Sequence, residues 1–265
     1  MPKINAERKI VKKDQRSYDH RVEVVFSPAQ YDLYQEDMDI VVVIDVLRAT
    51  SAMVTAFENG AKAIIPVATV DEAKAYLGKE GFIAAAERNG EVVEGFPIGN
   101  SPYDFMGDHV KGKTVVISTT NGTRAITMAK DKPHLVIGSM LNLDAICEWL
   151  IEQEKNVLLF CSGWQNKFNL EDTTCAGAII SQLLESGKFG LEEDTSIAAK
   201  FLFMAARANF TSMLKSAPRR KRLEQLDLLK DAKYCLTLNQ SRIIPVLKNG
   251  ELVKMESVVT PSTLN

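Results

Sequence analysis

The chain has 265 residues, of which 46% are hydrophobic, and a formal net charge of −2 at pH 7. This length is enough to bury a core in one large domain or two small ones. The charge gives no general affinity for nucleic acid, no apolar stretch approaches the roughly 20 residues of a membrane-spanning helix, and the N-terminus lacks a signal-peptide core. We therefore expect a cytoplasmic protein that binds neither nucleic acid nor membrane. Its four cysteines, without a CxxC pair, are expected to be reduced thiols.

The first 20 residues are rich in Lys, Arg and Glu and predict a flexible N-terminal arm, which leaves residues 21–265 as the domain. Apolar runs and turn residues predict strands over residues 22–26, 40–44, 61–67, 114–117 and 157–160, helices over 51–59, 71–77, 125–129, 175–184 and within 196–238, and a closing hairpin over 242–255. Alternating strands and helices are typical of an α/β fold in which helical layers cover a largely parallel sheet.

The strongest functional signal lies where the second predicted strand ends. The apolar run Ile40 to Ile44 predicts a strand buried on both faces, and Asp45 follows it directly. Ligands of open parallel sheets bind beyond the carboxyl ends of the strands, so Asp45 and Arg48 are candidate site residues. Thr50 and Ser51 are expected to cap the next helix, whose free N–H groups favour an anion in the same space.

Part of the sequence is repeated, because the segment Ile44 to Leu77 aligns without a gap on Ile117 to Leu150. The identical pairs are Ile44 and Ile117, Thr50 and Thr123, Ala52 and Ala125, Ala56 and Ala129, Ile64 and Ile137, Asp71 and Asp144, and Leu77 and Leu150. Each unit is predicted to run strand, polar turn, helix, strand, helix. Both polar turns are expected to open at the same edge of the sheet.

Further polar segments are expected near these turns. The turn of the second unit is dense in small hydrogen-bonding residues and has the composition of an anion cradle. Its candidate residues are Thr119, Thr120, Asn121, Gly122, Thr123 and Arg124. In the glycine-rich stretch from residue 85 to 105, Glu87 follows an apolar run, and Asn100 and Ser101 lie in a turn that presents an amide and a hydroxyl.

A third predicted strand, Val157 to Phe160, ends in Cys161-Ser162-Gly163. Glu171 and Asp172 then precede a helix, and Asp172 or Thr173 is expected to be its N-cap. Structural roles compete with functional ones at these acids. Asp172 can be a cap alone, and Glu171 by itself is best interpreted as an exposed loop charge.

Other residues also have a structural alternative. Asp45 can be a turn former, and Arg48 can simply pair with it. A covalent intermediate is left open, because cysteine and serine side chains stand at suggestive places, although no histidine in these turns supports a nucleophile pair. The candidate nucleophiles are Cys161, Cys175 and Ser118. The basic run at 219–222, followed by acids up to Asp231, is interpreted as a solvated helix start.

Six pieces of sequence resemble those of a known family. They are IDVLRATSA (44–52), AERNG (86–90), GFPIGNSP (95–102), STTNGTRA (118–125), CSG (161–163) and EDTTCAG (171–177). In this order and spacing they resemble the ComB family of 2-phosphosulfolactate phosphatases, from about residue 22 to the C-terminus. The resemblance implies a three-layer α/β/α fold. It also implies a Mg²⁺-dependent hydrolase that removes phosphate from 2-phospho-3-sulfolactate, a step of coenzyme M biosynthesis.

A small, highly acidic phosphoester needs several anion sites, and Arg48 and Arg124 can each form forked hydrogen bonds to its oxygens. The expected neutral contacts are Thr50, Ser51, Asn100, Ser101, Thr119, Thr120, Asn121, Gly122 and Thr123. A hard divalent cation held by carboxylates would neutralise the transferred phosphate. Its candidate ligands are Asp45, Glu87, Glu171 and Asp172. The residues expected to act in catalysis are Asp45, Arg48, Glu87 and Asp172.

Two alternatives are left open: the same site acting on another phosphorylated hydroxy acid, and a catalytically silent anion-binding relative. The first is prompted by Ser216-Ala217-Pro218-Arg219, which stands where the family carries Ser-x-His-Gly. A phosphatase of the haloacid dehalogenase type is disfavoured, because Asp45-Val46-Leu47 lacks the second acid of the DxD signature. Exposed apolar helices such as Phe201 to Ala206 offer a surface for a homodimer.

Overall fold

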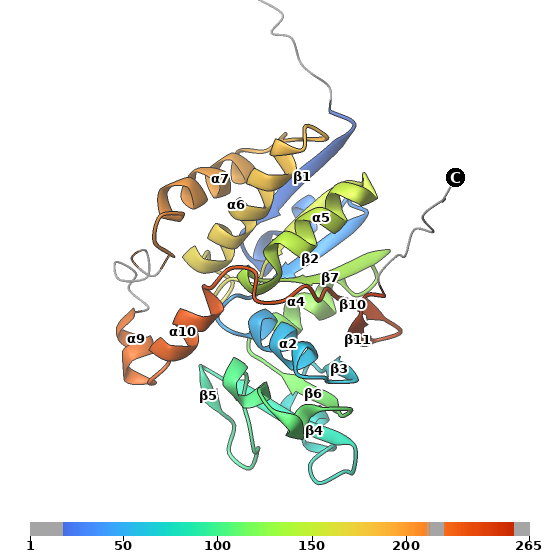
Figure 1. Cartoon of the computed structure of the whole chain (residues 1–265), viewed down its shortest axis with the longest axis vertical. Helices are drawn as coiled ribbons and strands as arrows, with labels where there is room; N and C mark the ends of the chain where they lie inside the picture. Colours follow the sequence, from blue (N-terminus) through green and yellow to red (C-terminus); the bar gives the residue numbers. More distant parts are fainter. Residues whose placement is uncertain (1–17, 211, 213–219, 257–265) are drawn as a thin grey trace, which may run out of the picture.

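The computed structural model describes residues 18–210, 212 and 220–256 (Figure 1). Within them, eleven strands form one sheet in the order β5-β4-β6-β3-β11-β10-β7-β2-β8-β1-β9. The strands are β1 (His20–Val25), β2 (Ile40–Ile44), β3 (Ala63–Pro66), β4 (Phe82–Arg88), β5 (Glu91–Val92), β6 (Thr114–Ser118), β7 (His134–Gly138), β8 (Val157–Cys161), β9 (Phe189–Gly190), β10 (Pro245–Lys248) and β11 (Glu251–Lys254). Residues 1–17 of the expected arm lie outside the described residues.

Helices occupy both faces of this sheet. They are α1 (Tyr31–Tyr34), α2 (Ala49–Glu58), α3 (Val70–Lys74), α4 (Gly122–Ala129), α5 (Leu143–Gln153), α6 (Leu170–Glu185), α7 (Asp194–Ala206), α9 (Arg220–Gln225) and α10 (Leu229–Cys235). Short 3-10 helices are η1 (Pro28–Gln30), η2 (Pro102–Phe105), η3 (Asp108–Val110) and η4 (Met140–Asn142). No helix in the described part of the chain has the length and hydropathy needed to cross a membrane.

Strand β2 divides the two main cores, because its five residues are all buried and point alternately to opposite faces. Ile40, Val42 and Ile44 belong to one apolar cluster, which includes residues of α5 and α6. Val41 and Val43 belong to a second cluster, which includes residues of α2 and α4. Helices therefore cover the sheet on both sides, and the predicted α/β/α class is confirmed.

The repeated sequence corresponds to repeated structure. The first unit is β2-α2-β3-α3 and the second is β6-α4-β7-α5. We call the connection between β2 and α2 the β2 turn (residues 45–48) and the connection between β6 and α4 the β6 turn (residues 119–121). Strand β2 pairs in parallel with β7, and β3 pairs in parallel with β6, so each unit contributes one strand to each pair.

The sheet is mixed, because the β10–β11 hairpin lies between the β6–β3 pair and the β7–β2 pair. Strand β11 is antiparallel to β3, β10 is antiparallel to β7, and the two hairpin strands are antiparallel to each other. Strands β7, β2, β8 and β1 therefore run opposite to β3, β6 and β4 along the sheet. The two turns approach each other from oppositely running blocks, whereas the sequence predicted that they open at one edge of a parallel sheet.

Most predicted elements match the observed ones within a few residues. The hairpin was expected to close the domain, and its turn at Asn249 and Gly250 has positive φ angles of 52° and 84°, as a two-residue hairpin of this type requires. It instead fills the middle of the sheet. Helix α6 begins at Leu170, ahead of the predicted start at Cys175, so the acids expected in a loop lie in its first turn.

Candidate functional site

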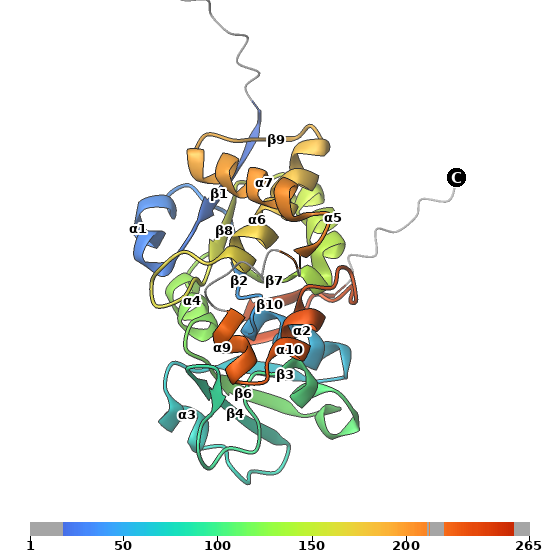
Figure 2. The ribbon, with the colours of Figure 1, turned by 90° about the vertical axis from the view of Figure 1, so that its left-hand side faces the viewer.

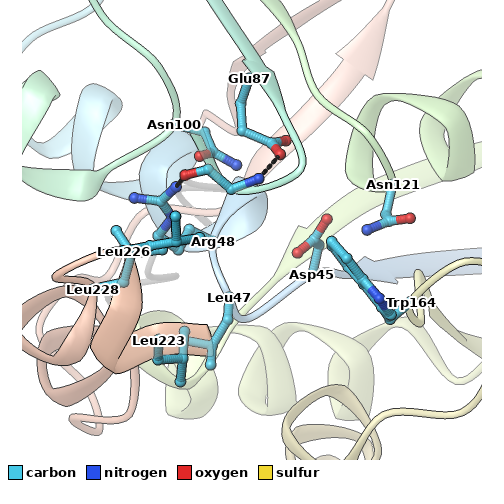
Figure 3. Close-up of a pocket in the computed structure, with 11 residues that line it drawn as sticks. Asp45, Leu47, Arg48, Glu87, Asn100, Asn121, Trp164, Leu223, Leu226 and Leu228 are labelled. Atoms are coloured by element: carbon cyan, nitrogen blue, oxygen red, sulfur yellow. Dashed lines mark hydrogen bonds between the residues drawn. The ribbon is translucent and has the colours of Figure 1, made fainter. Parts of the chain in front are cut away.

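A pocket opens where the β2 turn, the β6 turn, the end of β4 and the α9–α10 segment meet (Figure 3). The space between its walls, including the part that is open solvent, is about 500 Å³. Its lining residues are Asp45, Leu47, Arg48, Glu87, Gly90, Asn100, Asn121, Trp164, Leu223, Leu226 and Leu228. The pocket thus combines several residues predicted from the sequence with an apolar wall that was not predicted.

Asp45 lies at the N-termini of two helices. Its side chain is buried, and its backbone N–H donates to Thr50 Oγ1 (3.1 Å) in the first turn of α2. A Cβ atom at Gly122, the first residue of α4, would lie 2.9 Å from Asp45 Oδ2 and 2.5 Å from Ala49 Cβ. Only glycine therefore lets α4 approach this closely. The positive ends of both helix dipoles favour negative charge here, on Asp45 or on a ligand.

Arg48 is buried in the wall of the pocket, with 7% of its surface exposed. Its guanidinium donates from Nη1 to Asp231 Oδ2 (2.5 Å) and from Nη2 to the carbonyl oxygen of Gly90 (2.7 Å). The structure thus gives Arg48 an ion pair with an acid of α10, whereas the alternative from the sequence was Asp45. The Asp231 carboxylate offsets the charge of Arg48, and the two hydrogen bonds fix the guanidinium in the pocket wall.

Glu87 fastens the β6 turn to the end of β4. Its buried carboxylate accepts from Thr120 N (3.0 Å), Thr120 Oγ1 (3.0 Å) and Gly90 N (2.5 Å). The neighbouring Arg88 donates to Ser118 Oγ (2.8 Å), which occupies that hydroxyl. Glu87 therefore has a clear structural role in addition to its place on the pocket wall.

Several of the predicted anion-binding hydroxyls shape the turns. Thr119 N donates to Thr123 Oγ1 (3.2 Å), and Thr123 N donates to Thr119 Oγ1 (3.1 Å). Ser51 Oγ donates to the carbonyl oxygen of Val46 (2.9 Å). Ser101 Oγ accepts from Tyr103 N (3.3 Å) at the start of η2. These contacts order the backbone around the pocket, and none of these four hydroxyl side chains lines it.

Two amide side chains do line the pocket. Asn121 precedes α4, and Asn100 comes from the loop before η2 (Figure 3). Asn100 is 95% buried, since 5% of its surface is exposed, and within the described residues its Oδ1 has no hydrogen-bond partner. A buried amide oxygen costs free energy unless it finds a partner, so Asn100 Oδ1 is suited to a ligand that donates to it or to a cation.

Asp172 fastens the β2 turn to the β8 end. Its fully buried carboxylate accepts from Val46 N (2.9 Å), Gly163 N (3.0 Å) and Asn169 Nδ2 (2.9 Å). Burial, together with nearby Asp45 and Glu171, raises the pKa of Asp172 well above its usual range. The N-cap of α6 is Asn169, whose Oδ1 accepts from Asp172 N, so the predicted caps Asp172 and Thr173 are wrong.

The four predicted metal ligands do not converge as one cluster. Glu171 is buried in the first turn of α6, so its interpretation as an exposed charge is wrong. Asp45 and Glu87 line the pocket, whereas Glu171 and Asp172 do not. Among the described residues, no group of three or more His, Cys, Asp or Glu side chains is arranged to hold a metal ion. A cation here would need ligands from amides, water or substrate.

Two further predictions find little geometric support. Arg124 is exposed on α4, and its Nη1 donates to Asn166 Oδ1 (2.8 Å), outside the pocket lining. Cys161 and Cys175 are fully buried, and burial raises the pKa of both thiols, so they stay protonated at neutral pH. Thiols in this state are poor nucleophiles.

Sequence reasoning missed the contribution of the α9–α10 segment. Asp231 was interpreted as part of a solvated helix, but it is 6% exposed and pairs with Arg48. Leu226 lies so close to the β4–β5 turn that a Cβ at Gly90 would be 2.8 Å from its Cδ1. The departure from the family pattern at residues 216–219 lies outside the described residues.

The comparisons with known proteins define the class. They place the chain among phosphoric monoester hydrolases. The chain belongs to the 2-phosphosulpholactate phosphatase family, whose model matches residues 25–250.

Relatives in several bacteria support this membership. A protein of Caldanaerobacter subterraneus subsp. tengcongensis named probable 2-phosphosulfolactate phosphatase is 39% identical over 213 residues, covering 79% of this chain and 88% of the relative. A protein of the same name from Synechocystis is 41% identical over 212 residues, covering 78% and 88%. Another from Clostridium perfringens strain 13 is 36% identical over 245 residues, covering 90% and 98%.

Proposed function

We propose that this protein is a Mg²⁺-dependent phosphatase that hydrolyses 2-phospho-3-sulfolactate to 3-sulfolactate and phosphate, a reaction of coenzyme M biosynthesis carried out in the cytoplasm. The observation that carries the proposal is the pocket at Asp45, where a carboxylate, a buried arginine and two helix N-termini meet. Membership of the family and the names of its relatives supply the substrate.

The pocket residues suit a substrate with three anionic groups. Arg48 would offer the N–H donors of a guanidinium fixed in position, because Asp231 and the Gly90 carbonyl hold it. The N-termini of α2 and α4 add partial positive charge from two directions. Asn121 and Asn100 add neutral groups that can distinguish orientations of the substrate. Together these groups would hold the phosphate beside Asp45 and the rest of the substrate toward the opening.

A magnesium ion fits this set of oxygen atoms. Asp45 and Glu87 supply carboxylates, and the partnerless Asn100 Oδ1 supplies a third hard oxygen in the same pocket. Mg²⁺ is commonly held by one or two carboxylates with the remaining positions taken by water and phosphate oxygens. When bound, the ion would neutralise charge on the transferred phosphate and lower the pKa of a bound water. Glu171 and Asp172 would act by holding α6 and the β2 turn in place.

Hydrolysis places one water oxygen on phosphorus and breaks the bond between phosphorus and the C2 oxygen of the substrate. The C2 oxygen leaves as the hydroxyl of sulfolactate, and the two hydrogen atoms of water end on this hydroxyl and on phosphate. The residues on the pocket wall contribute by neutralising charge and fixing the geometry of this displacement, which supplies most of the catalysis in phosphoryl transfer.

The test is phosphate release from synthetic 2-phospho-3-sulfolactate, with Mg²⁺ and with EDTA. We expect turnover that EDTA abolishes and that Asp45→Asn lowers by about 100-fold or more. Ser118→Ala changes the aligned position of the second unit and serves as the matched control, with a loss below about tenfold. A folded wild-type protein without turnover would overturn this substrate, and turnover of a second phosphorylated hydroxy acid in its place would identify the open alternative.

A further inference from the structure

Helix α7 lies beside α6 at the end of the molecule where β1 and β9 close the sheet (Figures 1 and 2). Its inner face is tightly packed. Ser196 is buried and donates to the carbonyl oxygen of Val22 (3.1 Å), and Ala199 is fully buried. A Cβ at Gly177 of α6 would lie 2.0 Å from the carbonyl oxygen of Ala199, so the two helices are in backbone contact.

The outer face of α7 is apolar, although it faces solvent in the single chain. Ile197, Phe201 and Met204 are 41%, 63% and 44% exposed, and their spacing of four and three residues places them on one side of the helix. Ala198 and Ala205 are exposed beside them. A surface helix normally carries polar residues on this side, so α7 has the composition of a helix that is buried on both faces.

This concentration of exposed apolar side chains distinguishes α7 from the rest of the described surface. The other large exposed apolar residues are spread over separate elements: Tyr18, Leu33, Val92, Phe168, Leu229 and Leu238. Single exposed apolar residues are ordinary, whereas a contiguous patch marks an interaction surface.

We propose that the outer face of α7 is the contact surface of a homodimer, in which α7 of one chain packs antiparallel against α7 of a second copy. The charges of the helix support this occupant. Asp194 at the N-terminal end of the helix and Arg207 just beyond its C-terminal end are both exposed. An antiparallel pair centred near Phe201 brings Asp194 opposite the partner's Arg207, twice by symmetry, and brings Ile197 opposite the partner's Met204.

The same charges disfavour a parallel pair, in which Asp194 would face its own copy and Arg207 would face its own copy. Antiparallel packing also places each helix N-terminus beside the partner's C-terminus. The two alanines leave room on either side of the central phenylalanine, so that Phe201 of each chain can enter a shallow hole in the other helix. Ile197 and Met204 thereby find apolar partners in the other chain.

Sedimentation velocity between about 1 and 100 µM tests the proposal. We expect a concentration-dependent dimer that Phe201→Glu weakens by about tenfold or more, because it places a charge at the centre of the contact. The matched control is Leu33→Glu, which changes an apolar side chain that is 78% exposed on α1 and leaves the dimer unchanged. Thermal unfolding of each variant checks that the fold is intact.

A charge exchange tests the antiparallel geometry itself. Asp194→Arg and Arg207→Asp should each weaken the dimer several-fold, because each places like charges opposite one another. The double variant restores opposite charges and should return the dissociation constant to within about threefold of the wild type. A wild-type chain that stays monomeric at 100 µM, a dimer indifferent to Phe201→Glu, or a double variant weaker than both single ones would each overturn the proposal.

Discussion

The β2 turn and the β6 turn share a scaffold and differ in chemistry. In both, a threonine in the first turn of the helix accepts a backbone N–H from the turn: Thr50 from Asp45, and Thr123 from Thr119. In both, a distant carboxylate accepts a second backbone N–H: Asp172 from Val46, and Glu87 from Thr120. The repeated unit thus supplies two rigid turns, which meet at the pocket.

The aligned positions show which side chains each of the two turns contributes to the pocket. Asp45 and Arg48 of the β2 turn correspond to Ser118 and Asn121, so only the first of the two turns carries charged side chains at these positions. Ala49 corresponds to Gly122, which gives Asp45 the space it needs. The second unit therefore contributes close approach and neutral donors. A duplicated scaffold can therefore form an asymmetric site. One copy carries the charged side chains, and the other has a small residue that leaves space for them.

The largest expected effect comes from removing the charge that only the β2 turn carries. Arg48→Met leaves Asp231 buried without its partner, and breaking a buried ion pair in this way costs about 3–5 kcal/mol. The double variant Arg48→Met with Asp231→Leu removes both charges and should recover most of this loss. Urea unfolding measures both free energies.

The control for this prediction is the aligned residue. Asn121 makes no side-chain cap bond to the backbone of α4, so Asn121→Ala should cost less than about 1 kcal/mol. If Arg48→Met and Asn121→Ala lower the free energy of unfolding by the same small amount, the ion pair between Arg48 and α10 does not distinguish the two turns.

A smaller effect on the free energy of unfolding is expected from changing Gly122 and Ala49, the residues at which the two turns come into contact. Gly122→Ala places a methyl group 2.5 Å from Ala49 Cβ and 2.9 Å from Asp45 Oδ2, and overpacking of this kind costs about 1–3 kcal/mol. Adding Ala49→Gly relieves the first clash and leaves the second. The double variant should therefore regain part of its stability while phosphate release stays low.

Thermal unfolding and phosphate release, measured on the same samples, separate these two effects. Ala49→Gly alone provides the control, since it removes a methyl group from α2 without touching Asp45. Full activity in Gly122→Ala would show that the close approach of α4 to Asp45 has no bearing on the reaction.

The parts of this arrangement that were predictable are local in sequence. The buried run of β2 and the repeated unit are encoded in consecutive residues, so periodicity and alignment identify them. The predicted caps Thr50 and Ser51 are wrong, because α2 begins at Ala49 and its N-cap is Arg48. The start of α6 was also encoded, because Asn169 stands three residues before Asp172 in the spacing of an N-cap motif, but the polar residues around it obscured the pattern.

The parts that were not predictable depend on residues far apart. Arg48 and Asp231 are 183 positions apart, and nothing in either neighbourhood marks them as a pair. The β10–β11 hairpin, near the C-terminus, enters the sheet between β3 and β7 and reverses the strand direction there, which no local pattern reveals. Contacts between residues far apart in the sequence therefore determine which of the predicted polar residues line the pocket and which only stabilise the backbone around it.

Glu23 sharpens the comparison, because one oxygen atom of its buried carboxylate has no donor among the described residues, whereas Asp172 and Glu87 each accept several hydrogen bonds. Glu23 on β1 is 3% exposed, and within the described residues its Oε2 has no hydrogen-bond partner. Burial, with a smaller contribution from Glu193, raises its pKa from about 4.5 to about 7. Between these pH values the Glu23 carboxyl loses its proton in the unfolded chain and keeps it in the folded chain. The contribution of Glu23 to the free energy of unfolding therefore falls as pH rises from about 4.5 to 7 and does not change further above that range.

Glu23→Gln removes this titration, so the free energy of unfolding should change less between pH 4.5 and 7 in the variant than in the wild type. The two changes should differ by at most about 3 kcal/mol. The variant should therefore be relatively more stable than the wild type at pH 8 than at pH 4.5. Urea unfolding at both pH values measures the change. Parallel pH dependence in the two proteins would mean that Glu23 ionises normally in the fold, and that a buried carboxylate of this chain does not need the donors that Asp172 receives.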